Sequence, residues 1–118
     1  NGLSWSRKAD LPAGRWGAAS IVHEGKIWVM GGMVDSRVSA TVIIYDAEAD
    51  AWRTGSPLPL PSLGGAAVNA DGRILIFSGH PDPVFKVHEY NNAAWALVDT
   101  GAALERCSTQ ACGRVLLG

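Results

Sequence analysis

The sequence predicts an all-β fold built from repeated units of four short antiparallel strands. The order of features in the segment that begins at Trp5 returns 47 residues later, in the segment that begins at Trp52, and Trp95 opens a third copy after 43 more residues. Turn signals cut each unit into strand-length pieces. No segment holds the apolar period of about 3.6 residues that is typical of a helix. Together these observations favour a repeat architecture.

Two full units are expected, over 17–54 and over 65–98. In each of them an acidic residue followed by glycine predicts a tight hairpin turn, Glu24-Gly25 in the first unit and Asp71-Gly72 in the second, because glycine adopts positive φ without steric cost. A longer polar loop separates the second strand from the third. The expected strands lie at 17–23, 26–30, 41–45 and around Trp52 in the first unit, and at 65–69, 73–77, 85–90 and around Trp95 in the second.

The chain ends are interpreted as parts of neighbouring units. Residues 1–7 are expected to be the last strand of a preceding unit, and 103–118 the start of a third full unit. Because the chain begins at Asn1 rather than Met, we interpret it as a piece of a longer protein. Its opening residues have neither the basic start nor the apolar core of a signal peptide.

The second strand of each unit is an unbroken apolar run, Ile27–Met30 in the first and Ile74–Phe77 in the second. A continuous run, rather than an alternating one, predicts a strand that is covered on both faces. Runs this short also exclude a membrane-spanning helix, so a soluble protein is expected.

Composition limits the classes of partner. An apolar content of 47% is enough for one packed core, and a charged fraction of 18% is too low for a disordered segment. The formal net charge of −1 offers no electrostatic attraction for nucleic acid or an anionic membrane. Cys107 and Cys112 form neither a zinc motif nor a disulfide framework, so free thiols and a reducing, cytoplasmic compartment are expected.

The residues that mark the repeat resemble a known signature. Gly31-Gly32 ends an apolar strand and is followed by Tyr45 and then by Trp52, a pattern that closely resembles the kelch repeat. In the second unit the equivalent residues are Ser78-Gly79, Tyr90 and Trp95. The resemblance implies a β-propeller of radially arranged four-stranded blades, in which these residues have structural roles: the glycines permit close backbone approach and the aromatic side chains fill the space between blades.

Two points follow for the architecture. WD-type propellers have a similar repeat length, but no Gly-His and Trp-Asp pairs recur with the repeat here. A closed propeller takes at least about four blades, so the chain is expected to form an incomplete ring. The remaining blades are expected from the rest of a longer chain or from self-association.

Residues with metal-binding or catalytic chemistry are few. His80, Asp82 and His88 flank the loop after the second strand of the second unit, and we interpret the segment as a solvated loop with surface histidines rather than a metal site. His23 is interpreted as a surface residue at a turn. No nucleophile, metalloprotease or phosphate-binding motif is present, so no catalytic, cofactor-binding or metal-binding residues and no cofactor are expected.

The loops are the expected functional elements, because propellers present variable loops on a rigid scaffold. Six loop residues are candidate partner contacts. Trp16 either contacts a partner or packs beneath a proline-containing loop, and the run 57–61 is interpreted as a stiff connection. The candidates are Arg15, Trp16, Asp35, Arg37, His80 and Asp82.

The kelch resemblance implies a non-catalytic module whose inter-strand loops bind a protein partner, as in adaptors and scaffolds. Two other classes stay open. Kelch-like propellers also occur in copper radical oxidases that resemble galactose or glyoxal oxidase and in sugar mutarotases, and a propeller can also bind glycans.

Overall fold

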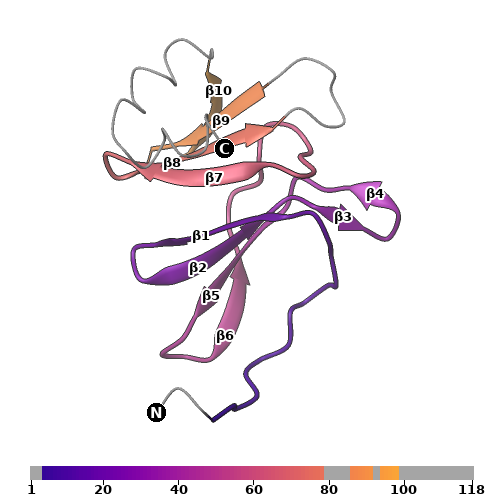
Figure 1. Cartoon of the computed structure of the whole chain (residues 1–118), viewed down its shortest axis with the longest axis vertical. Helices are drawn as coiled ribbons and strands as arrows, with labels where there is room; N and C mark the ends of the chain where they lie inside the picture. Colours follow the sequence, from indigo (N-terminus) through magenta and orange to yellow (C-terminus); the bar gives the residue numbers. More distant parts are fainter. Residues whose placement is uncertain (1–3, 79–85, 92–93, 99–118) are drawn as a thin grey trace.

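The computed structural model describes residues 4–78, 86–91 and 94–98 of the 118-residue chain, and these residues form ten β-strands and no helix. The strands make two four-stranded antiparallel sheets and one small hairpin (Figure 1). The first sheet contains β1 (Ala19–His23), β2 (Lys26–Met30), β5 (Val42–Asp46) and β6 (Ala51–Thr54). The second contains β7 (Ala66–Ala70), β8 (Arg73–Ser78), β9 (Lys86–Tyr90) and β10 (Trp95–Val98). The hairpin pairs β3 (Met33–Val34) with β4 (Arg37–Val38).

The expected all-β fold of four-stranded antiparallel units is confirmed. In both sheets the strands follow one another in the order of the sequence, with the β3–β4 hairpin inserted between β2 and β5. The turn residues Glu24 and Gly25 have φ of 51° and 75°, and Asp71 and Gly72 have 51° and 76°. Two successive residues with positive φ match the right-handed twist of the strands that they join. The acidic-plus-glycine pairs therefore set both of these hairpins.

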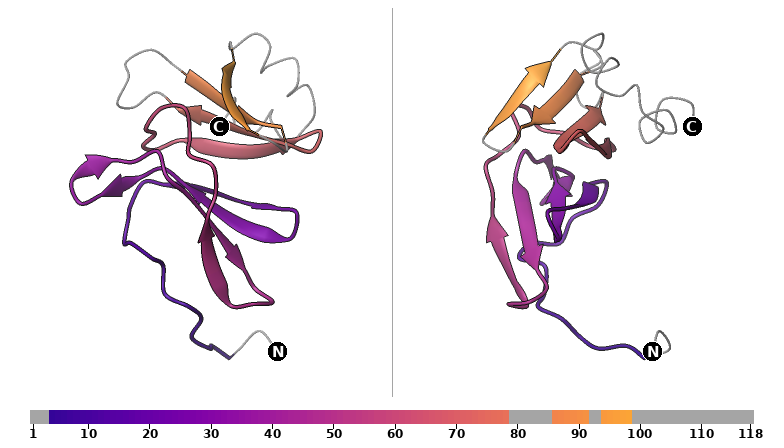
Figure 2. Two further views of the ribbon diagram at one scale, coloured as in Figure 1. Left: turned by 180° about the vertical axis from the view of Figure 1, so that it is seen from behind. Right: turned by 90° about the vertical axis from the view of Figure 1, so that its left-hand side faces the viewer.

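The two sheets are stacked face to face, with β1 beside β7 (Figure 2). Alternate residues of each strand point into the space between the sheets, as the pleat requires. The buried cluster there consists of Ala19, Trp28, Met30, Val42 and Ile44 from the first sheet, Leu58 from the connection between the sheets, and Ile74 and Ile76 from the second sheet. A second cluster lies on the other face of the second sheet and consists of Val68, Ala70, Leu75, Phe77 and Val87.

The expectation that the second strand of each unit is covered on both faces is right for β8 and wrong for β2. All four residues of the run Ile74–Phe77 are buried. In β2 the side chains alternate, and Ile27 is 42% exposed, whereas its equivalent in the second unit, Ile74, is 0% exposed. Ile74 faces the first sheet, whereas Ile27 lies on the outer face of the first sheet, which no further sheet covers in the described part of the chain.

The structure describes the N-terminal end of the chain from residue 4 but not the C-terminal end. Residues 4–10 form no strand in this structure, and Trp5 is almost fully exposed. The segment 103–118, including both cysteines, lies outside the described residues. No segment among those described forms a helix that could span a membrane.

The loop after β2 is more ordered than the sequence suggested. In place of an irregular polar loop, residues 33–38 form the β3–β4 hairpin, which projects from the side of the molecule (Figure 1). Its two turn residues, Asp35 and Ser36, have φ of 49° and 64°. This tight turn contains no glycine, so no hairpin could be predicted there from the sequence.

Candidate functional site

The glycine doublet at the end of β2 brings three loops together. Gly31 has φ of 71° and Gly32 of 92°, a region that favours glycine. A Cβ atom on Gly31 would lie 2.5 Å from the backbone oxygen of Ser62, and one on Gly32 would lie 2.9 Å from the backbone oxygen of Trp16. Both predicted properties of the doublet, close approach and positive φ, are therefore present. We call this meeting point of the loops 11–18, 31–41 and 55–65 the loop junction.

Backbone hydrogen bonds hold the loop junction together. Gly32 donates its N–H to the carbonyl of Ser62 at 2.8 Å, and its own carbonyl accepts from the N–H of Ser39 at 2.8 Å. Ser62 donates to the carbonyl of Ser39 at 3.1 Å, and Gly64 donates to the carbonyl of Gly17 at 2.8 Å. The connection between the two sheets is thus hydrogen-bonded both to the hairpin and to the loop that precedes β1, which makes the loop junction a rigid surface.

Trp16 extends the hairpin by one strand position. Its main chain pairs antiparallel with Met33, since Met33 donates to the carbonyl of Trp16 at 2.8 Å and Trp16 donates back at 3.4 Å. Met33 in turn lies opposite Val38. Directly opposite residues share one face of a sheet, so Trp16, Met33 and Val38 form one row of apolar side chains, which we call the apolar row. Trp16 is 64% exposed, so it does not pack beneath the proline-containing loop.

Arg15 lies on the inner side of the loop junction. Its guanidinium donates from Nη1 to the carbonyl oxygen of Gly31 at 3.1 Å and to Oγ1 of Thr41 at 3.0 Å. Partial burial lowers the pKa of the Arg15 side chain from its ordinary value, and the group stays charged because that value is so high. Arg15 therefore stabilises the loops on which Trp16 is carried.

The other charged candidates lie at the tip of the hairpin. Asp35 and Arg37 are exposed, and neither forms an ion pair with another residue in the described part of the chain. The structure thus places Arg15, Trp16, Asp35 and Arg37 in or beside one surface. His80 and Asp82 lie outside the described residues, as does Gly79 of the second signature.

The interpretation of two histidines as surface residues is wrong. His23 is 6% exposed, and its ring lies 5.3 Å from that of Trp28 and 6.3 Å from that of Tyr90. Its Nδ1 lies 3.1 Å from Oδ1 of Asn69, so it joins the two sheets. His88 is 1% exposed, and burial lowers the pKa of its imidazole. The described residues contain no group of three or more His, Cys, Asp or Glu side chains that could hold a metal ion.

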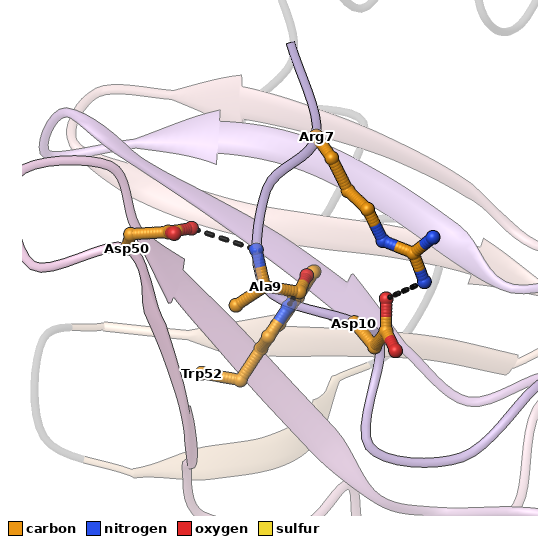
Figure 3. Close-up of polar contacts among 5 residues, drawn as sticks. All are labelled: Arg7, Ala9, Asp10, Asp50 and Trp52. Carbon is orange, nitrogen blue, oxygen red and sulfur yellow. Dashed lines mark hydrogen bonds and ion pairs between the residues drawn. The ribbon is translucent and has the colours of Figure 1, made fainter.

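A group of hydrogen bonds that could not be predicted from the sequence attaches the N-terminal segment around Ala9 to the first sheet (Figure 3). Tyr45 donates its hydroxyl hydrogen to Oδ1 of Asp50 at 2.5 Å. The N–H of Ala9 donates to the same oxygen at 2.8 Å. Trp52 donates Nε1–H to the carbonyl of Ala9 at 3.0 Å. The residue Asp50 follows Tyr45 by five positions, but nothing in that spacing indicates that a segment about 40 residues upstream completes the contact.

These hydrogen bonds change the ionisation of both side chains. The hydrogen bond to Asp50 raises the pKa of Tyr45 to about 12. The hydrogen bond from Tyr45, followed by that from Ala9, lowers the pKa of the Asp50 carboxyl. The signature residues Tyr45 and Trp52 thus have hydrogen-bond partners for their polar atoms, and their rings pack 5.0 Å apart. Tyr90 and Trp95 repeat this ring contact at 5.2 Å in the second sheet.

Stacked four-stranded antiparallel sheets, each running through its strands in sequence order, are the blades of a β-propeller. The fold of the protein solved as YjhT supports this assignment: it superposes with a TM-score of 0.69 over 80% of this chain and 40% of that one, at 16% identity. The described residues therefore make two blades of an incomplete ring.

Comparison of sequences identifies the type of blade. The kelch motif matches residues 15–59. Beta-scruin of Limulus polyphemus is 37% identical over 64% of this chain, and the kelch repeat and BTB domain-containing protein 1 of cowpox virus is 29% identical over 86%. Kelch-like protein 35 of Homo sapiens is 28% identical over 64%. Residues 15–59 thus match a kelch repeat, and the chain is similar to kelch-repeat proteins over most of its length. It spans 8%, 19% and 13% of the lengths of these three relatives.

Proposed function

We propose that the chain is a non-catalytic binding module and that the loop junction, with the apolar row at its surface, contacts a protein partner. The observation that carries the proposal is the 64% exposure of Trp16 on a backbone that hydrogen bonds hold on both sides. Tryptophan is enriched among the residues that dominate protein interfaces, where its large apolar surface is removed from water.

The rigidity of the loop junction supports the same function. Ordering a flexible loop on binding costs free energy, and a loop that is already fixed avoids that cost. Here Gly32, Ser39 and Ser62 are joined by three backbone hydrogen bonds, and Arg15 adds two more from its side chain. The main chain of Trp16 is therefore already held in place before a partner binds.

Two exposed tryptophans allow a matched test of the proposal. A photoreactive benzoylphenylalanine replaces Trp16 in one variant and Trp5 in another, and each protein is irradiated in an extract of the source organism. We expect a discrete cross-linked protein from position 16 and none of the same mass from position 5. Equal cross-linking from both positions, or none from position 16, would contradict the proposal. So would stoichiometric bound copper together with turnover of simple alcohols or aldehydes, which is the behaviour of the oxidase alternative.

A further inference from the structure

We propose that the outer edge of β4 receives an extended peptide segment as an added antiparallel strand, with an apolar residue opposite Val38 and a carboxylate residue opposite Arg37. This inference rests on the proposed function and specifies the chemistry of the partner at the same surface. Three observations carry it: unpaired main-chain groups on the edge, the apolar row beside them, and an exposed arginine without an ion-pair partner in the described part of the chain.

The direction of the main-chain groups of β4 follows from its pairing. Val34 lies opposite Arg37 across the two-residue turn, and Ser39 donates its N–H to the carbonyl of Gly32 at 2.8 Å. Successive residues of an antiparallel strand direct their N–H and C=O groups to opposite sides. The groups of Arg37 and Ser39 therefore point towards β3, and those of Val38 point outwards. Among the described residues, none forms a main-chain hydrogen bond with Val38 from that side.

The edge that is open to an added strand is short. Beyond Val38, the carbonyl of Ala40 accepts a hydrogen bond from the N–H of Leu58 at 2.8 Å, so the connection between the sheets occupies the next position on this side. An added strand can therefore exchange one pair of hydrogen bonds, with Val38. Because a single pair contributes little net free energy in water, side-chain contacts must provide much of the affinity.

The apolar row provides one of those contacts. A residue opposite Val38 on an added strand lies on the same face as Val38, Met33 and Trp16. An apolar side chain at that position extends the row by one member and removes more of it from water. Cross-strand apolar and aromatic pairs of this kind contribute roughly 0.2–1 kcal/mol each.

Arg37 provides the other contact and fixes the order of residues in the partner. Because the added strand runs antiparallel to β4, the residue that follows the one opposite Val38 lies opposite Arg37. The Arg37 side chain is exposed and has no ion pair among the described residues, and a carboxylate directly across from it is the complementary charge. The partner segment is thus an apolar residue followed by Asp or Glu.

A defined peptide tests the hydrogen-bond pattern. The probe is acetyl-Thr-Thr-Val-Glu-Thr-Thr-amide, titrated into the full ¹⁵N-labelled chain while amide shifts and hydrogen exchange are recorded. We expect the Val38 amide to shift and its exchange to slow at saturation. N-methylation of the peptide valine removes the N–H that bonds to Val38 and should weaken binding at least about tenfold, whereas N-methylation of the glutamate, whose N–H points away from β4, should leave it unchanged. No binding, or equal effects of the two methylations, would overturn the proposal.

A charge exchange tests the second half of the proposal. Arg37→Glu should weaken binding of the glutamate peptide by about fivefold, as expected for a solvent-exposed ion pair, and the same peptide with lysine in place of glutamate should recover the loss. Asp35→Asn leaves Arg37 in place and removes the nearby negative charge, so it should not weaken binding. A preference for glutamate that persists in Arg37→Glu would contradict the assigned register.

Val38→Pro separates this inference from the proposed function. The substitution removes the outward N–H and keeps an apolar side chain in the apolar row. The ladder between β3 and β4 is preserved, and an unchanged melting temperature verifies the fold. We expect cross-linking from position 16 to fall together with peptide binding. Undiminished cross-linking in Val38→Pro would overturn strand addition and leave the binding function of the loop junction in place.

Discussion

At the scale of single residues, Gly32 has the strictest requirement in the loop junction. Its φ of 92° excludes most side chains, and a Cβ atom would lie 2.9 Å from the backbone oxygen of Trp16. We expect Gly32→Val to destabilise the fold by at least about 2 kcal/mol, since a non-glycine residue at positive φ costs roughly 1–3 kcal/mol and the contact adds to that. Chemical denaturation measures the change.

Gly14 is a suitable control for Gly32. A Cβ atom there would meet nothing within 4 Å, so Gly14→Val should change the free energy of unfolding by less than about 0.5 kcal/mol. Equal losses in the two variants would show that bulk in the loops, rather than close approach at the doublet, limits stability.

The doublet could be predicted from the sequence because glycine has few structural uses at the end of a strand: positive φ and close approach. The two histidines could not. Whether His23 at the end of β1 faces solvent depends on Asn69 and Tyr90, which lie on another sheet and are far away in the sequence. A polar residue at a strand end is usually exposed, and only the stacking of the sheets overrides this tendency.

At the scale of elements, the strands with apolar runs and acidic-plus-glycine turns were predictable to within a residue or two, and the β3–β4 hairpin was not. The reason lies in its turn. Asp35 and Ser36 both have positive φ although neither is glycine, so the local sequence does not favour the turn that the structure contains. The pairing of Met33 with Trp16 on one side and with Val38 on the other holds the turn in place.

Replacing Ser36 should therefore stabilise the hairpin. Ser36→Gly removes the steric cost of positive φ and creates an Asp-Gly pair, the favoured sequence for this turn. We expect slower amide exchange at Arg37 and Ser39 and a gain of roughly 0.5–1 kcal/mol in local stability. Ser56→Gly, in an exposed loop residue, serves as the control. A loss of stability in Ser36→Gly would contradict the turn conformation assigned here.

At the scale of the whole molecule, the two blades are related by the repeat but differ in how they are covered. The face of the second blade that carries Tyr90 and Trp95 lies against the first blade. The equivalent face of the first blade carries Tyr45 and Trp52 and is covered in part by the segment around Ala9 (Figure 3). On that face Val22 and Ile27 remain exposed. Because each repeat of a propeller packs against its neighbours, we expect a further blade to pack against this surface.

The packing of one blade on the other also makes the stability of the molecule depend on pH. His88 lies in the space between the sheets, opposite Ile76, and its Nδ1 has no hydrogen-bond partner in the part of the chain that the structure describes. Burial favours the neutral imidazole and lowers its pKa below the ordinary value of 6.5. Since the unfolded chain takes up this proton more readily than the folded one, the contribution of His88 is complete above about pH 6.5 and is lost as the pH falls below that value.

The prediction is a decrease in the free energy of unfolding between pH 6.5 and 5, with a slope of at most about 1.4 kcal/mol per pH unit for this group. His88→Leu should flatten the slope, because leucine keeps the apolar contacts between the sheets and has no proton to take up. It should also raise stability at low pH, since no unpaired polar atom remains buried. Urea denaturation at several pH values measures both effects. The carboxyl of Asp50, whose pKa is lowered, acts only at more acidic pH, so an unchanged slope in His88→Leu would assign the effect to a group other than His88.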